Sequence, residues 1–214
     1  MTDFAAARRN MVDGQVRTAD VTDLRILSAM LAVPREAFLP KDQAGLAYLD
    51  LDAPIGGGRR LVKPMVLAKL IQAAELSASD RVLDVGCGTG YAAAVLARMA
   101  GHVVALEQDA RLAQAARAAL GALPNVAVQG GTLTEGWPHD GPYDAILVEG
   151  ATEVEPQHLL RQLKDGGRLV CVLGSGPGKA MLYRRSGQES GGRAIFDAAA
   201  PVLPGFVKPP EFAF

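Results

Sequence analysis

The stretch Val82-Leu83-Asp84-Val85-Gly86-Cys87-Gly88-Thr89-Gly90-Tyr91 decides the fold of this chain. An apolar run ends there in three glycines at alternate positions, and residues 92–99 continue in an Ala- and Leu-rich helical pattern. This order predicts a strand, a tight turn and a helix. Glycines lack a Cβ atom, so the backbone can turn sharply and a ligand can lie against it. A turn that leads into a helix also presents free backbone N–H groups.

A second strand is predicted at residues 102–107, and it closes on Glu107. An acidic residue in that place, about 20 positions after the glycines, can accept both hydroxyls of a ribose. Dinucleotides and S-adenosylmethionine both fit this layout. The spacing G-x-G-x-G after Asp84 resembles the first motif of class I methyltransferases, whereas the dinucleotide fingerprint is G-x-G-x-x-G. An acid beside the turn would repel a pyrophosphate but suits a cationic sulfonium, so we expect S-adenosyl-L-methionine as the cofactor.

Composition narrows the class of protein. The chain has 214 residues, 49% of them hydrophobic, and a formal net charge of −1. Residues 64–178 hold 8 Lys and Arg against 12 Asp and Glu. This segment has no basic stripe, so we do not expect nucleic-acid binding. Two cysteines far apart indicate a reducing compartment without a disulfide framework. Neither a signal pattern nor an apolar run of membrane-spanning length is present, and we expect a cytoplasmic protein.

The N-terminal third is predicted to be helical. Periodic apolar residues indicate helices over residues 3–17 and 22–32, the second with Thr22 as its N-cap. A proline-bounded connector follows at 34–40. Three glycines and two arginines within residues 56–64 indicate a loop, and Pro64 suits the first position of a helix that runs to about residue 76.

From residue 80 onward strands and helices alternate, which predicts a doubly wound, mostly parallel sheet. The expected strands are 81–86, 102–107, 125–129, 143–149 and 168–174, and the expected helices are 90–100, 109–120 and 156–164, the last ended by Gly166 and Gly167. Residues 180–185 and 193–198 predict an antiparallel hairpin at the sheet edge. We therefore expect an α/β fold of the class I methyltransferase (Rossmann-like) type, with an N-terminal helical extension and substrate-side loop at 1–63 and the donor-binding core at 64–214.

Ligands of open parallel sheets bind beyond the carboxyl ends of the strands, where strand order reverses. Glu107 is the candidate for the ribose hydroxyls, Asp84 for the amino-acid end of the donor, Thr132 for the adenine edge and Glu149 for the donor or the substrate. The full set of candidate donor-binding residues is Asp84, Gly86, Cys87, Gly88, Thr89, Gly90, Glu107, Gln108, Gly131, Thr132, Leu133 and Glu149. The three histidines have no metal-ligand spacing, and no metal site is expected.

Nearly the whole chain resembles the protein-L-isoaspartate O-methyltransferase family. The matching blocks are residues 11–17, 33–40, 47–48, 54–56, 64, 82–91, 94–97, 136–138, 143–146 and 162–170. The N-terminal blocks are not general methyltransferase features. The resemblance implies methylation of the free carboxylate of isoaspartyl residues in damaged proteins, which lets them return to aspartate through a succinimide.

The chain departs from the family pattern where the substrate chemistry is expected. The family's loop reads G-Q-T-I-S-Q-P, whereas residues 58–64 read Gly-Arg-Arg-Leu-Val-Lys-Pro, so Val62 occupies the hydroxyl position and no catalytic residue is assigned. The family's acid after the third strand is replaced by Gly131 or Thr132. Arg59 and Arg60 could clamp an anionic acceptor, because a guanidinium binds a carboxylate with two hydrogen bonds.

Three functions stay open at this point. The first is a carboxyl methyltransferase with a rebuilt acceptor pocket around Arg59, Arg60 and Val62, acting on a protein or peptide. The second is a methyltransferase of the same fold with another acceptor, protein or small molecule. The third is a donor-binding or interaction module without catalysis. The sequence gives no indication of the oligomeric state.

Overall fold

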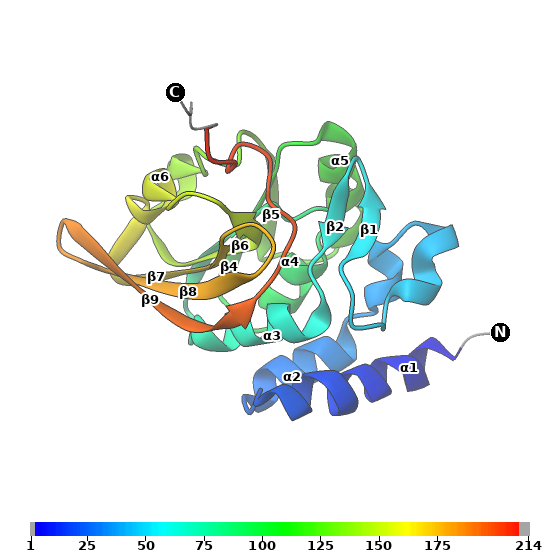
Figure 1. Ribbon diagram of the computed structural model, residues 1–214. Helices are drawn as coiled ribbons and strands as arrows, with labels where there is room; N and C mark the ends of the chain where they lie inside the picture. The colour runs from blue at the N-terminus through cyan, green and yellow to red at the C-terminus, as the bar shows by residue number, and fades with distance from the viewer. Residues whose placement is uncertain (1–2, 210–214) are drawn as a thin grey trace, which may run out of the picture.

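The computed structural model describes residues 3–209 and centres on a seven-stranded sheet of order β5-β4-β3-β6-β7-β8-β9 (Figure 1). The parallel part comprises β3 (Arg81–Val85), β4 (His102–Glu107), β5 (Val126–Gly130), β6 (Tyr143–Thr152) and β7 (Leu163–Leu173). β8 (Gly178–Ser186) and β9 (Glu189–Ala198) continue the sheet antiparallel to β7 and to each other. The predicted parallel sheet with a C-terminal hairpin is confirmed.

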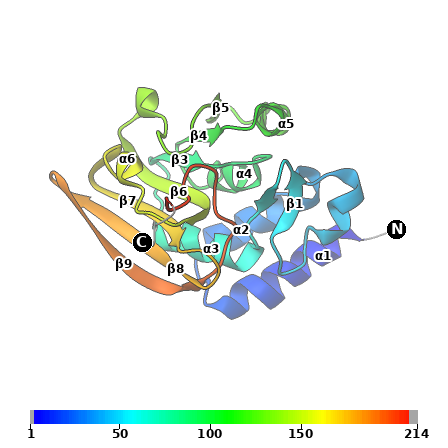
Figure 2. The ribbon, with the colours of Figure 1, turned by 45° about the horizontal axis from the view of Figure 1, so that its top comes forward.

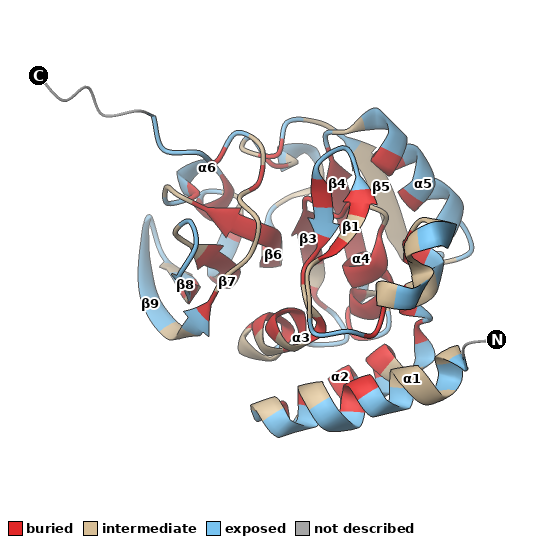
Figure 3. Ribbon diagram, turned by 45° about the vertical axis from the view of Figure 1, so that its right-hand side comes forward, coloured by how far each residue is buried: buried red, intermediate tan, exposed pale blue. Residues whose placement is uncertain are grey.

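Alternation along the central strands divides the core into two faces. Val82, Val103 and Ala105 pack toward α3 (Pro64–Ala73), α4 (Tyr91–Leu96) and α5 (Ala110–Leu120). Leu83, Val104 and their neighbours pack on the other face, which is covered by the short α6 (Gln157–Leu160), by Leu133 and by the segment with Leu203 and Phe206. Burial is concentrated in β3, β4 and α4 at the centre of the molecule (Figure 3).

The N-terminal segment packs as an outer helical layer beneath α3 and α4. α1 (Phe4–Met11) runs on through a π-helical turn (Val12–Val16) and a 3₁₀ turn (Arg17–Ala19), and α2 (Leu24–Ala32) follows (Figures 1 and 2). The predicted helix at 3–17 is therefore present with changes of helical type. Two 3₁₀ turns (Arg35–Phe38 and Lys41–Leu46) lead from α2 to a separate two-stranded sheet.

That small sheet corrects the loop expected at residues 56–64. β1 (Ala53–Gly56) and β2 (Arg59–Leu61) pair as an antiparallel hairpin, and Gly57 and Gly58 form its turn with φ of 59° and 73°. Positive φ at successive turn residues is the conformation that tight hairpins need and that glycine adopts without strain. Pro64 begins α3, as predicted.

Several other predictions of element ends were wrong. The helix expected at 90–100 ends as α4 at Leu96, and the strand expected at 143–149 extends as β6 to Thr152. The helix expected at 156–164 is only the single turn α6, and Gly166 and Gly167 lie inside β7, where the register to β6 shifts. The glycines accommodate this irregularity rather than end a helix. Asp23, and not Thr22, is the N-cap of α2, because its side chain accepts a hydrogen bond from the N–H of Arg25.

Candidate functional site

The strand order reverses at β3, so the loops that follow β3, β4 and β6 meet at one edge of the sheet. The turn between β3 and α4 has positive φ at Gly86, Gly88 and Gly90, of 79°, 56° and 98°. The N–H groups of Gly86 and Cys87 donate to the carbonyl of Leu106, at 2.8 and 3.1 Å, which ties the turn to the end of β4. The structure thus forms the predicted glycine turn beside the predicted acid.

Glu107 ends β4 and is fully buried. One carboxylate oxygen, Oε1, accepts from the N–H groups of Gln108 and Asp109 at 2.8 and 3.0 Å. The other, Oε2, accepts from the N–H of Gly88 at 2.8 Å. Three backbone donors therefore hold the carboxylate in a fixed orientation against the glycine turn.

The strongest partner of Glu107 is Arg59 of β2, which approaches from a distant part of the sequence. Its Nη1 lies 2.8 and 3.0 Å from the two carboxylate oxygens, and its Nη2 donates to the carbonyl of Gly86 at 2.8 Å. The Arg59 side chain is 8% exposed. Arg60, the next residue, is exposed and donates to the carbonyl of Asp52. The two predicted clamp arginines consequently lie in different environments.

Asp84 near the end of β3 and Glu149 within β6 form a buried acidic pair. Burial, opposed by a hydrogen bond to Glu149 and reinforced by the charge of Glu107, raises the pKa of Asp84 to about 7. Burial and the neighbouring Asp84 raise the pKa of Glu149 well above its usual value. Both oxygens of Asp84 and Oε1 of Glu149 have no partner of good geometry among the described residues.

Arg35 and Tyr91 complete the buried polar group, although sequence reasoning singled out neither as a site residue. The Arg35 guanidinium lies over the Tyr91 ring, 4.6 Å from its centroid, and donates to the carbonyls of Ala47 and Val62 at 2.8 and 3.0 Å. Burial lowers the pKa of Arg35. The available signal was an arginine within the proline-bounded connector 34–40, surrounded by apolar residues that predict burial.

The remaining predicted donor residues line the loops around this centre. Thr89 donates from its hydroxyl to the carbonyl of Phe38, and the N–H of Gly131 donates to the carbonyl of Glu107. Cys87 and Leu133 are buried, whereas the predicted adenine contact, Thr132, is exposed. Trp137 packs near Gly131 and donates to Asp140, a structural role for the indole.

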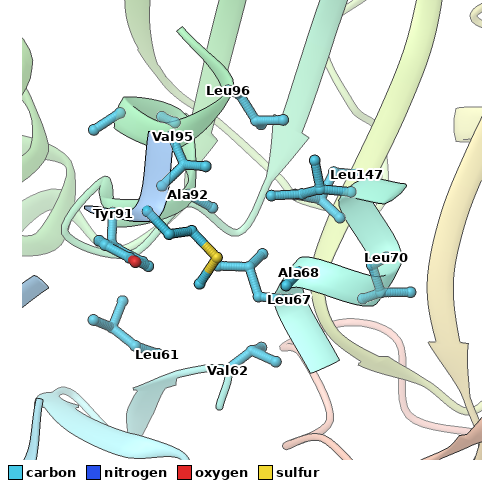
Figure 4. Packing of buried hydrophobic residues seen from close by; sticks show 14 of the residues in the cluster. Leu61, Val62, Leu67, Ala68, Leu70, Tyr91, Ala92, Val95, Leu96 and Leu147 are labelled. Carbon is cyan, nitrogen blue, oxygen red and sulfur yellow. The ribbon is translucent and has the colours of Figure 1, made fainter. Parts of the chain in front are cut away.

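Val62 is buried in the apolar cluster that joins the end of β2 to α3 and α4. Its side chain lies with Leu61, Leu67 and Tyr91 (Figure 4). Its backbone carbonyl contacts the buried polar residues, because it accepts a hydrogen bond from Arg35. Since a valine side chain has no hydrogen-bonding atom, this position cannot supply the hydroxyl of the family pattern.

The residues present fit a cationic adenosine donor. The unpartnered oxygens of Asp84 and Glu149 are acceptors suited to an ammonium and to a nearby sulfonium. Glu107 is an anion at the position expected for a ribose, and the glycine turn gives close access to the backbone. Beside this centre, a cavity of about 400 Å³ is lined by Phe38, Ile55, Thr89 and Leu112, among others.

Two further features are absent from residues 3–209. No group of three or more His, Cys, Asp or Glu residues is arranged to hold a metal ion there. In the same part of the chain, none of the helices has the length and apolar character needed to cross a membrane.

Comparison with known proteins places these features in one family. The family model described as protein-L-isoaspartate(D-aspartate) O-methyltransferase matches residues 7–200. The chain is 46% identical over 185 residues to protein-L-isoaspartate O-methyltransferase 1 of Rhodopseudomonas palustris (strain HaA2), covering 86% of this chain and 76% of that protein. It is 48% identical over 181 residues to the protein-L-isoaspartate O-methyltransferase of Methylorubrum extorquens (strain PA1), covering 84% and 79%.

Solved structures agree with the sequence relatives. A protein-L-isoaspartate O-methyltransferase superimposes with a TM-score of 0.79 at 26% identity, covering 92% of this chain and 66% of that chain. A putative protein-L-isoaspartate O-methyltransferase of Plasmodium falciparum, solved in complex with S-adenosyl-L-homocysteine, superimposes with a TM-score of 0.77 at 18% identity, covering 92% and 97%. The latter likeness supports the fold alone. From the family match, the close relatives and the shared fold together, the chain belongs to the protein-L-isoaspartate O-methyltransferase family.

Proposed function

We propose that the chain transfers the methyl group of S-adenosylmethionine to the free carboxylate of isoaspartyl residues in proteins or peptides. The observation that carries the proposal is the combination of the glycine turn, the fixed carboxylate of Glu107 and the unpartnered carboxyl oxygens of Asp84 and Glu149 at the switch point of the sheet. Family membership supports the acceptor. We also propose a cytoplasmic location, since damaged intracellular proteins would be the substrates.

The bound donor supplies an electrophilic methyl group and a neutral thioether leaving group. The chain therefore has to bind, align and exclude water, and the methyl acceptor has to be an ionised nucleophile. Glu107 would hold the ribose diol of the donor, and the carbonyl of Gly86 with Asp84 and Glu149 would receive its cationic amino-acid end. Transfer would form a bond between a carboxylate oxygen of the substrate and the methyl carbon, and the electron pair of the C–S bond broken would go to sulfur.

Two cationic residues lie close to Val62 in the sequence. Arg60 and Lys63 flank Val62 at the end of the hairpin, and Arg60 is exposed. We propose that they attract the acceptor carboxylate in place of a loop hydroxyl. Removal of Arg60 is then expected to raise the KM for an isoaspartyl peptide more than it lowers kcat, because an exposed cation contributes to encounter and binding of the substrate.

Methyl transfer from labelled S-adenosylmethionine to an isoaspartyl peptide tests the proposal. We expect a base-labile methyl ester on that peptide and none on the same peptide with an ordinary aspartate. A chain that binds the donor and leaves the isoaspartyl peptide unmodified would have another acceptor or no catalytic activity, and the proposal would be wrong.

One observation favours a second candidate, a methyltransferase of the same family fold with a different acceptor. Val62 lacks the hydroxyl of the family's loop pattern, and its buried side chain offers an acceptor carboxylate no hydrogen bond. A panel of amine and hydroxyl acceptors run beside the isoaspartyl peptide separates the two candidates.

A further inference from the structure

The guanidinium of Arg59 occupies two contacts that the proposed donor requires. Its Nη1 lies on both oxygens of Glu107, the acid proposed for the ribose hydroxyls. Its Nη2 lies 2.8 Å from the carbonyl oxygen of Gly86, beside the place proposed for the ammonium group. The Arg59 side chain thus occupies both the contact proposed for the ribose and the contact proposed for the ammonium group.

With Arg59 in place, Glu107 has no capacity left for a ribose. Its two oxygens accept five hydrogen-bond contacts, three from the backbone of Gly88, Gln108 and Asp109 and two from Arg59. A carboxylate offers about four lone-pair directions. The three backbone contacts are fixed by the fold, so the contacts to Arg59 are those that two ribose hydroxyls would have to replace.

Side chains also fill the space that the glycine turn leaves open. A Cβ atom on Gly86 would lie 3.0 Å from Arg59 Nη2 and 3.0 Å from Leu203 Cδ1. A Cβ atom on Gly88 would lie 2.5 Å from Ile55 Cδ1. Ile55 and Arg59 both belong to the β1–β2 hairpin, so the hairpin seals the turn against which the donor would lie.

We propose that Arg59 controls the affinity for the donor by competing with it for Glu107 and the carbonyl of Gly86. The donor then binds only when the Arg59 guanidinium moves away from these two groups. This inference rests on the proposed function. The hairpin is hydrogen-bonded separately from the large sheet, because among the described residues β1 and β2 pair only with each other, and the turn between them consists of Gly57 and Gly58. Arg60 and Val62 lie one and three positions after Arg59, so a movement of the hairpin that carries Arg59 away from Glu107 also moves the acceptor side of the site.

The size of the effect follows from the population of the open state. A binding-competent minor state populated at about 0.1–10% weakens apparent affinity by roughly 10- to 1000-fold. Removal of the Arg59 contact should recover at least the lower end of this range. Arg59→Gln is the appropriate change, because glutamine is the residue of the family's loop pattern at this position and it carries no charge.

The test is titration calorimetry of the full chain with S-adenosyl-L-homocysteine. We expect Arg59→Gln to lower the Kd by about 10-fold or more relative to the wild type. Arg184→Gln is the matched control. Arg184 lies on β8, away from the glycine turn, and forms an exposed ion pair with Glu75. Its Kd should equal that of the wild type.

The outcomes separate this inference from the proposed function. Equal Kd values for the wild type and Arg59→Gln would overturn the role of Arg59 and leave the proposed function intact. Absence of binding by both proteins would overturn the proposed function and the role of Arg59 with it. If Arg59→Gln does not fold by circular dichroism, Arg59→Lys serves instead, because a lysine keeps the charge but cannot bridge Glu107 and Gly86 with a planar fork. It should also bind more tightly than the wild type, and unchanged affinity would contradict the proposal.

Discussion

Three acidic residues are buried at the switch point, and one of them lies in a different environment from the other two. Glu107 is compensated by Arg59 and three backbone N–H groups. Both oxygens of Asp84 and Oε1 of Glu149 have no such donors among the described residues, and both groups carry raised pKa values, with burial as the first cause. An acid whose pKa is raised in the folded state favours folding while it is protonated. This part of the stability is complete below about pH 4 and is lost as the pH rises through about 7.

Asp84→Asn should therefore stabilise the unliganded protein at alkaline pH. The amide is neutral at every pH, so the free energy of unfolding at pH 8 should exceed that of the wild type by roughly 2–4 kcal/mol, with little difference near pH 4. Urea unfolding at both pH values measures this change.

Asp144→Asn is a control of opposite sign. Burial raises the pKa of Asp144, but the N–H of Arg81 and the ammonium of Lys164 outweigh burial and lower it. The variant should therefore lose stability at neutral pH. An Asp84→Asn protein that is less stable than the wild type at pH 8 would show that Asp84 is ionised and compensated in the folded chain.

Glu107→Gln should abolish binding of the donor product and destabilise the protein. The change leaves the buried guanidinium of Arg59 without its anion, and loss of one member of a buried pair costs about 3–5 kcal/mol. Chemical denaturation and calorimetry on the same preparation test both effects. A folded Glu107→Gln protein that still binds S-adenosyl-L-homocysteine with the wild-type Kd would exclude Glu107 as the ribose ligand.

At the scale of elements, sequence patterns predicted β3, β4, the glycine turn and Glu107 because those features are local. The partner of Glu107 could not be predicted, since Arg59 lies 48 positions away and reaches it only through the fold of the hairpin. Gly57 and Gly58 indicate a loop and a hairpin turn equally well, and only the pairing of Ala53 with Leu61 decides between them. The single turn of α6 was overpredicted because its apolar residues continue directly into β7.

Arg168 connects elements that the sequence keeps apart. From β7 its guanidinium donates to the carbonyls of Ala74 and Glu75 after α3, and it pairs with Asp80 before β3. Arg168→Ala should lower the free energy of unfolding by about 3–5 kcal/mol, because it leaves the buried carboxylate of Asp80 and the carbonyls of Ala74 and Glu75 without this hydrogen-bond donor. Guanidinium unfolding measures this cost.

Arg184→Ala is the matched control, because its ion pair with Glu75 is exposed on both sides. It should change stability by about 1 kcal/mol or less. Similar costs for the two variants would mean that Arg168 does not tie α3 to the sheet.

At the scale of the molecule, we propose that the division at residues 63 and 64 separates functions rather than folding units. Met11, Ile26 and Met30 of the N-terminal layer belong to the same hydrophobic core as Leu67 of α3 and Val95 of α4. A core shared in this way predicts one cooperative unfolding transition. Scanning calorimetry should give a calorimetric enthalpy equal to the van't Hoff enthalpy. Two resolved transitions, or a fragment 64–214 with native circular dichroism, would contradict this prediction.

The central claim is that the glycine turn and Glu107 bind an adenosine donor that Arg59 has to vacate. A crystal structure of the chain with S-adenosyl-L-homocysteine tests it most directly. We predict both ribose hydroxyls on the carboxylate of Glu107, the amino group near Gly86, Asp84 and Glu149, and the Arg59 guanidinium withdrawn from Glu107. A nucleoside bound elsewhere, or bound in the turn with the Arg59–Glu107 pair intact, would contradict the account.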